Sequence, residues 1–376
     1  MRKIKLFVDA HSFDKEHQGT RTFIKRLYLE LWKLRPDIEL YFGARDIDNL
    51  KEEFKEIEGC RFIQYRSSGT LRRLLFEIPL IVYKYKIDVA HFQYIGAFIK
   101  NCRQVITTHD VLFNDFKEEF SLLYRITRNV LFRYSLKNAD VKTTVSQYSK
   151  LSIQRHFKIP AGDIYVTPNS IGKESFVAFD KSLSKKYIND QFNIPSYILY
   201  VSRFEPRKNH VQLLRAYLDL KLYLKGHHLV MLGHTSIKTP AFDKLLAEQP
   251  AAIRKFIFIS ASVKDADMHH FYRGAEVFVY PSKAEGFGLP PVEAAALKIP
   301  VICSNTTAMS DFSFFGEYHL DPGDYGLFCK KLDKMMNALP GEAQLEKVAE
   351  AIFREYSQTL TALRFNEALS TCFPVA

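Results

Sequence analysis

Two glutamates, Glu285 and Glu293, stand eight residues apart around the sequence Gly-Phe-Gly-Leu-Pro-Pro. The run VFVYPS before this stretch predicts a buried strand. PVEAAALK, which begins with the second proline of the stretch and contains Glu293, predicts a helix that opens with proline. A glycine loop between a strand and a helix exposes backbone N–H groups, which bind phosphate. The glutamates would repel phosphate, but carboxylates accept hydrogen bonds from paired hydroxyls. The stretch therefore predicts a ligand that carries phosphate between two hydroxyl-bearing ends, such as a nucleotide sugar.

A second group of charged residues follows another predicted strand, YILYVSR. Arg203, Arg207 and Lys208 come at the end of this strand, and Asn209 is predicted to cap the next helix. Fixed cations at the end of a parallel strand can neutralise a diphosphate as it leaves a sugar. A solvated basic loop is the ordinary explanation of such residues. Together with the Glu285 stretch at a neighbouring strand end, however, they favour a binding site.

Two strand ends in the first half of the chain carry weaker signals. Gly19 directly precedes Thr20 after the first strand, where the backbone either approaches a phosphate or simply turns. The sequence TTHD places His109 beside Asp110 at another strand end, and a site role and a structural role are equally open for it. A single glycine is not the G-x-G-x-x-G of a nicotinamide site.

Two other motifs imitate sites that we do not expect. KDADMHH resembles a metal site, but Asp265 and Asp267 are better explained as acidic residues in the first turn of a helix. SQYSK places Ser146 and Ser149 after a strand, but it lacks the glycine elbow and the orienting histidine of a serine hydrolase. We therefore predict neither a metal centre nor a nucleophilic serine.

Strand-like and helix-like runs alternate along the whole chain, which predicts parallel sheets with crossover helices. A charged, weakly periodic segment at residues 172–195 separates two such series. A chain of 376 residues is also long for a single core. We therefore expect two doubly wound α/β domains, at residues 1–180 and 181–355, and a C-terminal helix at 356–376 that would cross back to the first domain.

The net charge of +11 is uneven, with +8 in residues 1–180 (30 basic, 22 acidic) and +3 in the remainder (23 basic, 20 acidic). The stretches LRRLLFEIPLIVYKYK and LLYRITRNVLFRYSLK combine bulky apolar residues with cations. They fit either an anionic membrane surface or ordinary packing on the protein's own core. No nucleic-acid partner is expected, because interleaved stacking aromatics and a recognisable module are missing.

The sequence also indicates a cytoplasmic location. The apolar run in MRKIKLFVDA ends at Asp9 and predicts a strand rather than a signal peptide. No stretch is long and apolar enough for a predicted membrane-spanning helix. The five cysteines are scattered without a C-x-x-C pair, which is typical of a reduced protein.

Several of these segments together resemble the family-4 retaining glycosyltransferases. The resemblance is carried by VSRFEPRKN at 201–209, by residues 271–305 around the two glutamates, and by TTHD, TVSQYSK and VTPNS. It implies the GT-B fold, in which two Rossmann-like domains face each other across a cleft. The first domain would bind the acceptor and the second the nucleotide sugar.

The resemblance also implies roles for the charged residues. Arg203 and Lys208 would hold the donor diphosphate. Glu285 would bind hydroxyls of the transferred sugar, and Glu293 the ribose diol. The family needs no metal or other cofactor, because cations and helix N-termini stabilise the leaving group. The leaving phosphate itself helps to deprotonate the acceptor.

Further donor contacts are implied for backbone groups and for the first domain. The N–H groups around Phe287, Gly288 and Leu289 would meet sugar or phosphate. His109 would lie near the donor sugar, and Gly19 near the junction of donor and acceptor.

QGTRTFIKRLY and FEPRKN most resemble transferases that build bacterial surface polysaccharides such as lipopolysaccharide, often from mannose donors. We therefore expect transfer of a hexose to a growing, lipid-linked glycan at the inner face of the cell membrane. GDP-mannose is the preferred donor and a UDP-hexose the alternative, because ISASVKDAD, where the base would sit, does not decide between them. A catalytically idle nucleotide-sugar-binding protein is the rival hypothesis, and the intact charged residues argue against it.

Overall fold

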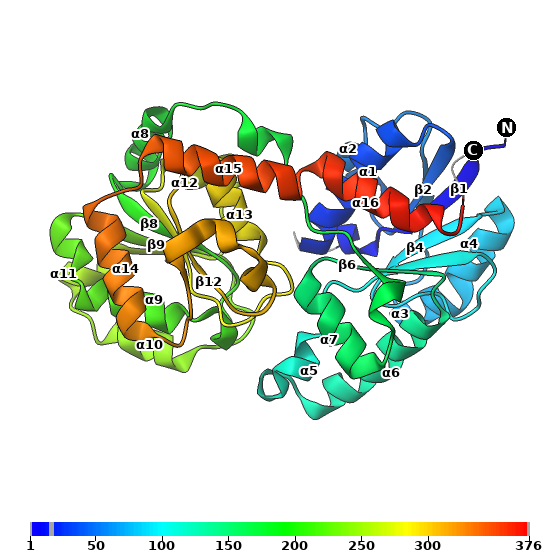
Figure 1. The fold of residues 1–376 in the computed structure, drawn as a ribbon, viewed down its shortest axis with the longest axis horizontal. Coiled ribbons are helices and arrows are strands. Elements are labelled where there is room, and N and C mark those ends of the chain that lie inside the picture. Colours follow the sequence, from blue (N-terminus) through cyan, green and yellow to red (C-terminus); the bar gives the residue numbers. More distant parts are fainter. Residues whose placement is uncertain (1, 15–18, 374–376) are drawn as a thin grey trace. The chain divides into compact units, whose positions relative to one another are not determined.

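The computed structural model describes residues 2–14 and 19–373, and the chain divides into two compact units (Figure 1). Unit 1 contains the residues up to Gly172 together with those from Tyr356 onward, and unit 2 is Lys173–Glu355. The first unit therefore ends before residue 180, where the sequence placed the boundary. The last helix, α16 (Gln358–Ser370), belongs to unit 1.

Unit 1 is built on a parallel sheet with the strand order β3-β2-β1-β4-β5-β6-β7. Its strands are β1 (Ile4–Asp9), β2 (Ile38–Ala44), β3 (Arg61–Gln64), β4 (Val89–Gln93), β5 (Arg103–Thr107), β6 (Val141–Thr144) and β7 (Ile164–Val166). Its α-helices besides α16 are α1 (Gly19–Leu34), α2 (Ile47–Glu53), α3 (Thr70–Arg72), α4 (Ile78–Tyr85), α5 (Leu112–Asp115), α6 (Leu122–Asn138) and α7 (Gln147–Phe157). The strand order reverses between β1 and β4, which makes this the topological switch point of the sheet.

Helix α16 joins unit 1 through buried side chains and through hydrogen bonds to distant segments. Its buried residues include Ala362, Phe365 and Leu369, which recur at helical spacing along one face. Thr361 donates its hydroxyl to the Pro168 carbonyl at 3.1 Å. Arg35, at the end of α1, donates to the Asn366 side chain at 2.8 Å. These contacts fix the C-terminal helix on unit 1 although the whole of unit 2 precedes it in the sequence.

Unit 2 has a parallel sheet with the order β10-β9-β8-β11-β12-β13. The strands are β8 (Tyr197–Val201), β9 (His228–Leu232), β10 (Ile257–Ser260), β11 (Val277–Tyr280), β12 (Val301–Ser304) and β13 (His319–Leu320). The α-helices are α8 (Lys181–Phe192), α9 (His210–Asp219), α10 (Pro240–Ala247), α11 (Ala251–Arg254), α12 (Asp265–Gly274), α13 (Leu289–Ala296), α14 (Tyr325–Asn337) and α15 (Glu342–Tyr356). The strand order reverses between β8 and β11, so loops after these strands flank the switch point.

Both sheets confirm the predicted α/β class, with doubly wound parallel strands and crossover helices. The sequence did not predict two of the four edge strands, β3 and β13. In β3 only Ile63 is buried, and β13 has two residues. Neither segment has the apolar run from which a strand is predicted.

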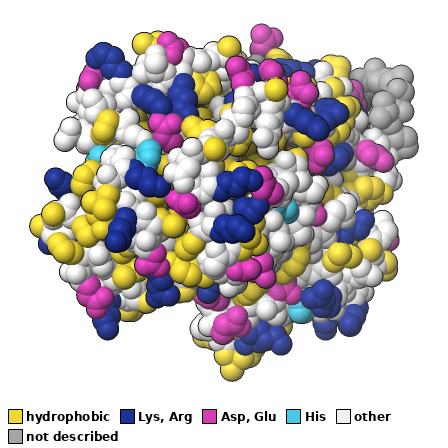
Figure 2. Space-filling model, turned by 60° about the vertical axis from the view of Figure 1, so that its left-hand side comes forward, with side chains coloured by type: hydrophobic (Ala, Val, Ile, Leu, Met, Phe, Trp, Pro, Cys, Tyr) yellow, Lys and Arg dark blue, Asp and Glu magenta, His cyan; other side chains and the backbone are white. Residues whose placement is uncertain are grey.

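The surface of unit 1 carries exposed apolar side chains on α3, α4 and α6. Tyr83 on α4 is 80% exposed, and Leu123 on α6 is 73% exposed. Ile78 of α4 and Phe132 of α6 belong to one buried cluster, so the other faces of these two helices pack on the core of unit 1. On the face of the molecule in Figure 2, basic side chains are interspersed with acidic and hydrophobic ones rather than gathered in one block. Within the described residues, no helix is long and apolar enough to cross a membrane.

Close packing at the ends of β8 and β9 requires a glycine. Gly233 follows β9 with φ +143°, and a Cβ added there would lie 2.1 Å from the Ser202 carbonyl oxygen. Both the backbone angle and the approach of a second backbone therefore exclude a side chain.

Gly233→Ala is expected to lower the free energy of unfolding by roughly 3 kcal/mol or more, because it combines backbone strain with a backbone clash. Urea denaturation followed by circular dichroism measures this effect. Gly326→Ala is the control in the same unit. Gly326 lies in α14, where an added Cβ makes only an ordinary contact of 3.7 Å, so its replacement is expected to be neutral or slightly stabilising. Equal effects of the two substitutions on the free energy of unfolding would contradict the conclusion that position 233 requires a glycine.

Candidate functional site

The two charged segments predicted from the sequence meet at the switch point of unit 2. β8 and β11 are paired in parallel, with Ile198 opposite Val277, so their carboxyl ends lie side by side. The Lys283 N–H donates to the Arg207 carbonyl at 2.8 Å, and the Arg207 guanidinium donates to the Ala284 carbonyl at 2.7 Å. The loop after β8 and the loop after β11 are thereby joined into one structure.

A buried ion pair lies at the centre of this structure. Lys208 Nζ is 2.5 Å from Glu285 Oε1, and the two residues are only 6% and 8% exposed. The Tyr280 hydroxyl donates to the same carboxylate oxygen at 2.8 Å. The sequence predicted that Lys208 and Glu285 bind one ligand. The structure adds that they bind each other.

Arg207 extends the ion pair into a chain of alternating charges. Its Nη1 lies 3.5 Å from Glu285 Oε2, and its Nη2 lies 2.8 Å from Glu205 Oε2. Arg203, with a half-exposed side chain, follows at 3.3 Å from the other Glu205 oxygen. Three cations and two carboxylates leave one net positive charge, which suits an anionic ligand. Glu205 is buried and belongs to no motif that predicts its role, and the sequence indicated no specific partner for Arg207.

The charges around Glu285 keep it ionised. Burial by itself would raise the pKa of this carboxyl, but the positive charges of Lys208 and Arg207 and hydrogen bonds from Lys208 and Ser282 lower it to about 2. Burial lowers the pKa of the Lys208 ammonium, and the Glu285 charge opposes this effect. Glu285 is therefore a carboxylate that accepts hydrogen bonds and is a weak base at neutral pH.

The glycine loop has its shape for two reasons. Gly288 caps α13 with φ +101°, and a Cβ there would lie 2.9 Å from Met309 Cγ and 3.1 Å from Phe312 Cε2. Phe287 is buried, and its ring meets that of Phe312 at a centroid distance of 5.7 Å. The side chain of Phe287 thus anchors the loop just before Leu289, where α13 begins.

Glu293 lies on α13, partly buried, about one turn after the glycine loop. Pro290 and Pro291 occupy the first turn of this helix and have no N–H. These two positions therefore offer no N–H donor at the helix start, and the donor role of the N–H groups at 287–289 stays a prediction.

Thr307 supports Glu285 in a way that the sequence did not reveal. The Glu285 N–H donates to Thr307 Oγ1 at 2.9 Å, and the Ala308 N–H donates back to the Glu285 carbonyl at 3.4 Å. Thr307 has φ +53°, which is unusual for a β-branched residue. Such strained residues concentrate at functional sites. No motif marks this threonine, so only the structure identifies it.

The other two predicted site residues belong to unit 1. His109 follows β5, and its Nε2 lies 2.7 Å from Gln93 Oε1. Its ring meets the Phe23 ring edge-on at 5.1 Å. Burial lowers the pKa of His109 to about 4, so its imidazole is neutral at pH 7. Gly19 is the exposed first residue of α1, and residues 15–18 before it lie outside the described structure.

Asp9 at the end of β1 is a further buried charged residue, and no sequence motif predicted its role. It is 1% exposed and accepts a hydrogen bond from the Tyr65 hydroxyl at 2.9 Å. His11 Nδ1 and Arg73 Nη2 lie 3.2 Å and 3.4 Å from its other oxygen. Burial opposes ionisation of Asp9, but His11 and Arg73 lower its pKa to about 2. This carboxylate holds together the segments at the switch point of unit 1.

Two residues of the KDADMHH motif have partners in unit 2. Asp267 accepts a hydrogen bond from the Tyr187 hydroxyl at 2.7 Å, and the His270 ring stacks on Tyr187 at 4.1 Å. In the part of the chain that the structure describes, no group of three or more His, Cys, Asp or Glu side chains is arranged to hold a metal ion.

The neutral state of His109 predicts a pH dependence of stability. Its pKa is about 4 in the folded protein, against 6.5 for an ordinary histidine. Below pH 6.5 this side chain gains a proton in the unfolded chain but not in the folded protein, so His109 contributes a fall in the free energy of unfolding of up to about 1.4 kcal/mol per pH unit down to about pH 4. The buried His91 and His210, whose pKa values are also lowered, add to the slope of the parent protein. Calorimetric melting between pH 7 and 4.5 measures this slope. His109→Gln should reduce it, whereas replacement of the exposed His269 by Gln should not, and equal slopes in all three proteins would refute the assignment.

Two family models match the chain. Glycosyltransferase Family 4 matches residues 17–174, and Glycosyl transferases group 1 matches residues 185–351. O-antigen chain mannosyltransferase B of Escherichia coli is 27% identical over 305 residues, which are 77% of this chain and 78% of that protein. O-antigen chain mannosyltransferase RfbU of Salmonella typhimurium is 26% identical over 226 residues, 59% of this chain and 57% of that protein.

Solved structures share the fold at low sequence identity. Sucrose-phosphate synthase from Thermosynechococcus elongatus has a TM-score of 0.75 at 18% identity, with 100% of both chains covered. HepE of Anabaena, solved in complex with UDP-glucose, has a TM-score of 0.72 at 14% identity, with 98% of this chain and 99% of that chain covered. With two doubly wound sheets and family matches in both halves, this chain belongs to the family 4 glycosyltransferases and has the GT-B fold.

Proposed function

We propose that the protein is a retaining hexosyltransferase that moves mannose from GDP-mannose to a growing surface glycan. The observation that carries this proposal is the Lys208–Glu285 pair at the switch point of unit 2, which places a buried carboxylate beside cations where ligands of such sheets bind. The names of the two mannosyltransferase relatives support mannose and a surface glycan. HepE, solved with UDP-glucose, supports a nucleotide sugar and keeps a UDP-hexose as the alternative donor.

Unit 2 would bind the donor and unit 1 the acceptor. Arg203 and Lys208 would contact the diphosphate, Glu285 the hydroxyls of the sugar, and Glu293 the ribose. Arg203 is half exposed, with its Nη2 3.3 Å from Glu205, so its guanidinium is accessible to a phosphate. His109 is neutral and would offer hydrogen bonds to the sugar rather than a charge.

In the transfer step, the bond from the anomeric carbon to the phosphate oxygen breaks and the bond to the acceptor oxygen forms on the same face. The acceptor proton passes to the leaving phosphate. Negative charge grows on that phosphate, and the cations after β8 stabilise it without reorganisation. Glu285, with a pKa of about 2, is a poor proton acceptor and suits hydrogen bonding instead. These fixed cations would take the part that a metal ion plays in other transferases.

A matched set of variants tests the donor site. Glu285→Ala would also release Lys208 and Tyr280, so Glu285→Gln is the better change because it keeps the shape of the side chain. It should retain GDP binding within a few-fold and lower mannose transfer about a hundredfold. Lys208→Ala should weaken GDP binding by roughly ten- to a hundredfold, since a charge-assisted hydrogen bond contributes about 1.5–3 kcal/mol. Calorimetric titration with GDP and UDP, and transfer assays without added metal, measure these effects.

Lys330→Ala is the control, because Lys330 is exposed on α14 and outside the site. Wild-type transfer by Glu285→Gln would overturn the donor assignment. Nucleotide binding by the parent protein without transfer to any lipid-linked glycan would favour the idle binder. Binding of UDP but not GDP would show that the donor is a UDP-hexose and not GDP-mannose.

We also propose that unit 1 docks on the anionic inner face of the cell membrane. Leu122, Ile126, Val130 and Tyr134 recur every fourth residue on α6 and are 64%, 53%, 63% and 40% exposed. Helix α6 contains four basic residues and no acidic one. An exposed apolar stripe flanked by cations fits an anionic lipid surface, where each nearby cation contributes about 1 kcal/mol.

Ile126→Asp combined with Val130→Asp should lower binding to vesicles of anionic lipid at least tenfold, because it places two carboxylates in the apolar stripe. Sedimentation with vesicles at increasing salt measures the binding, and a DNA column provides the comparison for non-specific charge effects. Leu224→Asp is the control, since Leu224 is 73% exposed in unit 2. Unchanged vesicle binding by the α6 variant, or stronger retention on DNA than on vesicles, would contradict the proposed docking surface.

A further inference from the structure

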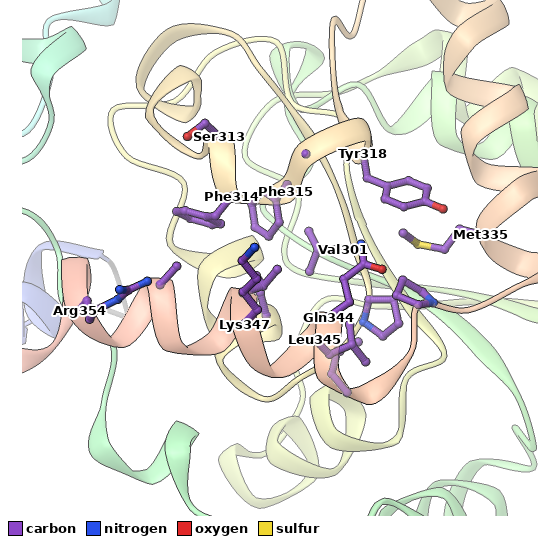
Figure 3. Close-up of a pocket in the computed structure, with 17 residues that line it drawn as sticks. Val301, Ser313, Phe314, Phe315, Tyr318, Met335, Gln344, Leu345, Lys347 and Arg354 are labelled. Carbon is purple, nitrogen blue, oxygen red and sulfur yellow. The ribbon is translucent and has the colours of Figure 1, made fainter.

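Unit 2 contains a cavity of about 370 Å³ that the donor site does not use (Figure 3). It lies between α15 and η9 (Ser313–Tyr318), beside the beginning of β12. Val301 in its wall is the first residue of β12, whereas the Glu285 loop follows the carboxyl end of the neighbouring β11. The cavity is therefore separate from the switch point, and its volume falls in the range of small-molecule sites.

The lining of this cavity combines an apolar interior with positive charge. Phe314, Phe315 and Tyr318 from η9 contribute aromatic side chains, and Leu345 and Val348 on α15 contribute aliphatic ones. No Asp or Glu is among the lining residues. The aromatic and aliphatic side chains therefore offer contacts to an apolar chain.

The two cations of the lining are Lys347 and Arg354, which lie seven residues apart on one face of α15. Both are exposed, and neither forms an ion pair or hydrogen bond with another described residue. Figure 3 shows Lys347 rising from α15 toward Phe314 and Phe315. The nearby carboxylate of Glu346 is engaged with Lys298 at 2.8 Å. Lys347 is thus available to an anion that enters beside the aromatic rings.

We propose that this cavity binds a single-chain amphipathic carboxylate. Its apolar chain would lie among Phe314, Phe315 and Leu345, and its carboxylate would pair with Lys347 at the exposed rim. This orientation removes the apolar chain from water while the charged head stays solvated, so neither group carries a large desolvation cost.

A row of aromatic contacts links the cavity to the glycine loop. Phe314 and Phe315 meet Phe312 at ring distances of 5.6 Å and 6.1 Å, and Phe312 meets Phe287 at 5.7 Å. Phe312 also limits the space at Gly288, where an added Cβ would lie 3.1 Å from its ring. A ligand that displaces the cavity aromatics would therefore move the wall of the loop. This consequence rests on the proposed donor site, and it predicts that the carboxylate changes nucleotide affinity.

Calorimetric titration of the full chain with decanoate, without nucleotide, tests the binding site. One molecule should bind saturably, and Lys347→Glu should weaken the affinity at least tenfold. Lys330→Glu makes the same charge change on α14, outside the cavity, and should leave the affinity unchanged. Ala351→Phe, which fills the cavity, should abolish binding, with circular dichroism as the check on folding. Absence of decanoate binding, or equal affinities of the Lys347→Glu and Lys330→Glu variants, would overturn the proposal.

A second titration tests the link to the glycine loop. Saturating decanoate should change the affinity for GDP or UDP at least threefold in the parent protein and not in Ala351→Phe, and the nucleotide should change decanoate affinity by the same factor. Decanoate binding with unaltered nucleotide affinity would overturn the link. Failure of every nucleotide to bind would overturn the proposed donor site, while the decanoate titration alone still decides the cavity.

Discussion

The buried pair of Lys208 and Glu285 is the interaction on which the candidate site depends. Each charge is too deeply buried to be stable alone, so each loop needs the other to compensate its charge. The pair joins the loops after β8 and β11, and Arg207 reinforces the same connection through the Ala284 carbonyl. A ligand at this place meets a charge pattern that exists before it binds. Such preorganisation is what stabilisation of a leaving diphosphate requires.

The backbone around this pair is held in conformations that most side chains disfavour. Gly288 and Gly233 have positive φ and contact neighbouring atoms so closely that a Cβ does not fit. Thr307 adopts φ +53° and in return accepts the Glu285 N–H. The packing of unit 2 offsets the local strain at these positions. The strained backbone in turn places the charged groups next to one another. The aromatic row from Phe287 extends this packing toward the cavity under α15.

Sequence patterns predicted the strands of both sheets wherever a strand is buried on both faces, because such strands are continuous apolar runs. The strands β3 and β13 were not predicted, because β3 has a single buried residue and β13 has only two residues, so neither contains an apolar run. The pattern also located Lys208 and Glu285, because the chemistry of a site requires particular residue types at strand ends. The roles of Glu205 and Thr307 were not predicted, because neither residue belongs to a local motif and both roles come from contacts with other residues of the site.

The sequence by itself determined the alternation of elements, the strand ends that carry charge, and the residue types available for chemistry. These properties depend on neighbours along the chain. Only the tertiary structure decided that Lys208 pairs with Glu285, 77 residues away, and which contacts hold the expected C-terminal helix α16 on unit 1. It also decided which charges are buried and therefore which protonation states persist, as for His109. Pairing and burial depend on strand order and packing, which no local pattern encodes.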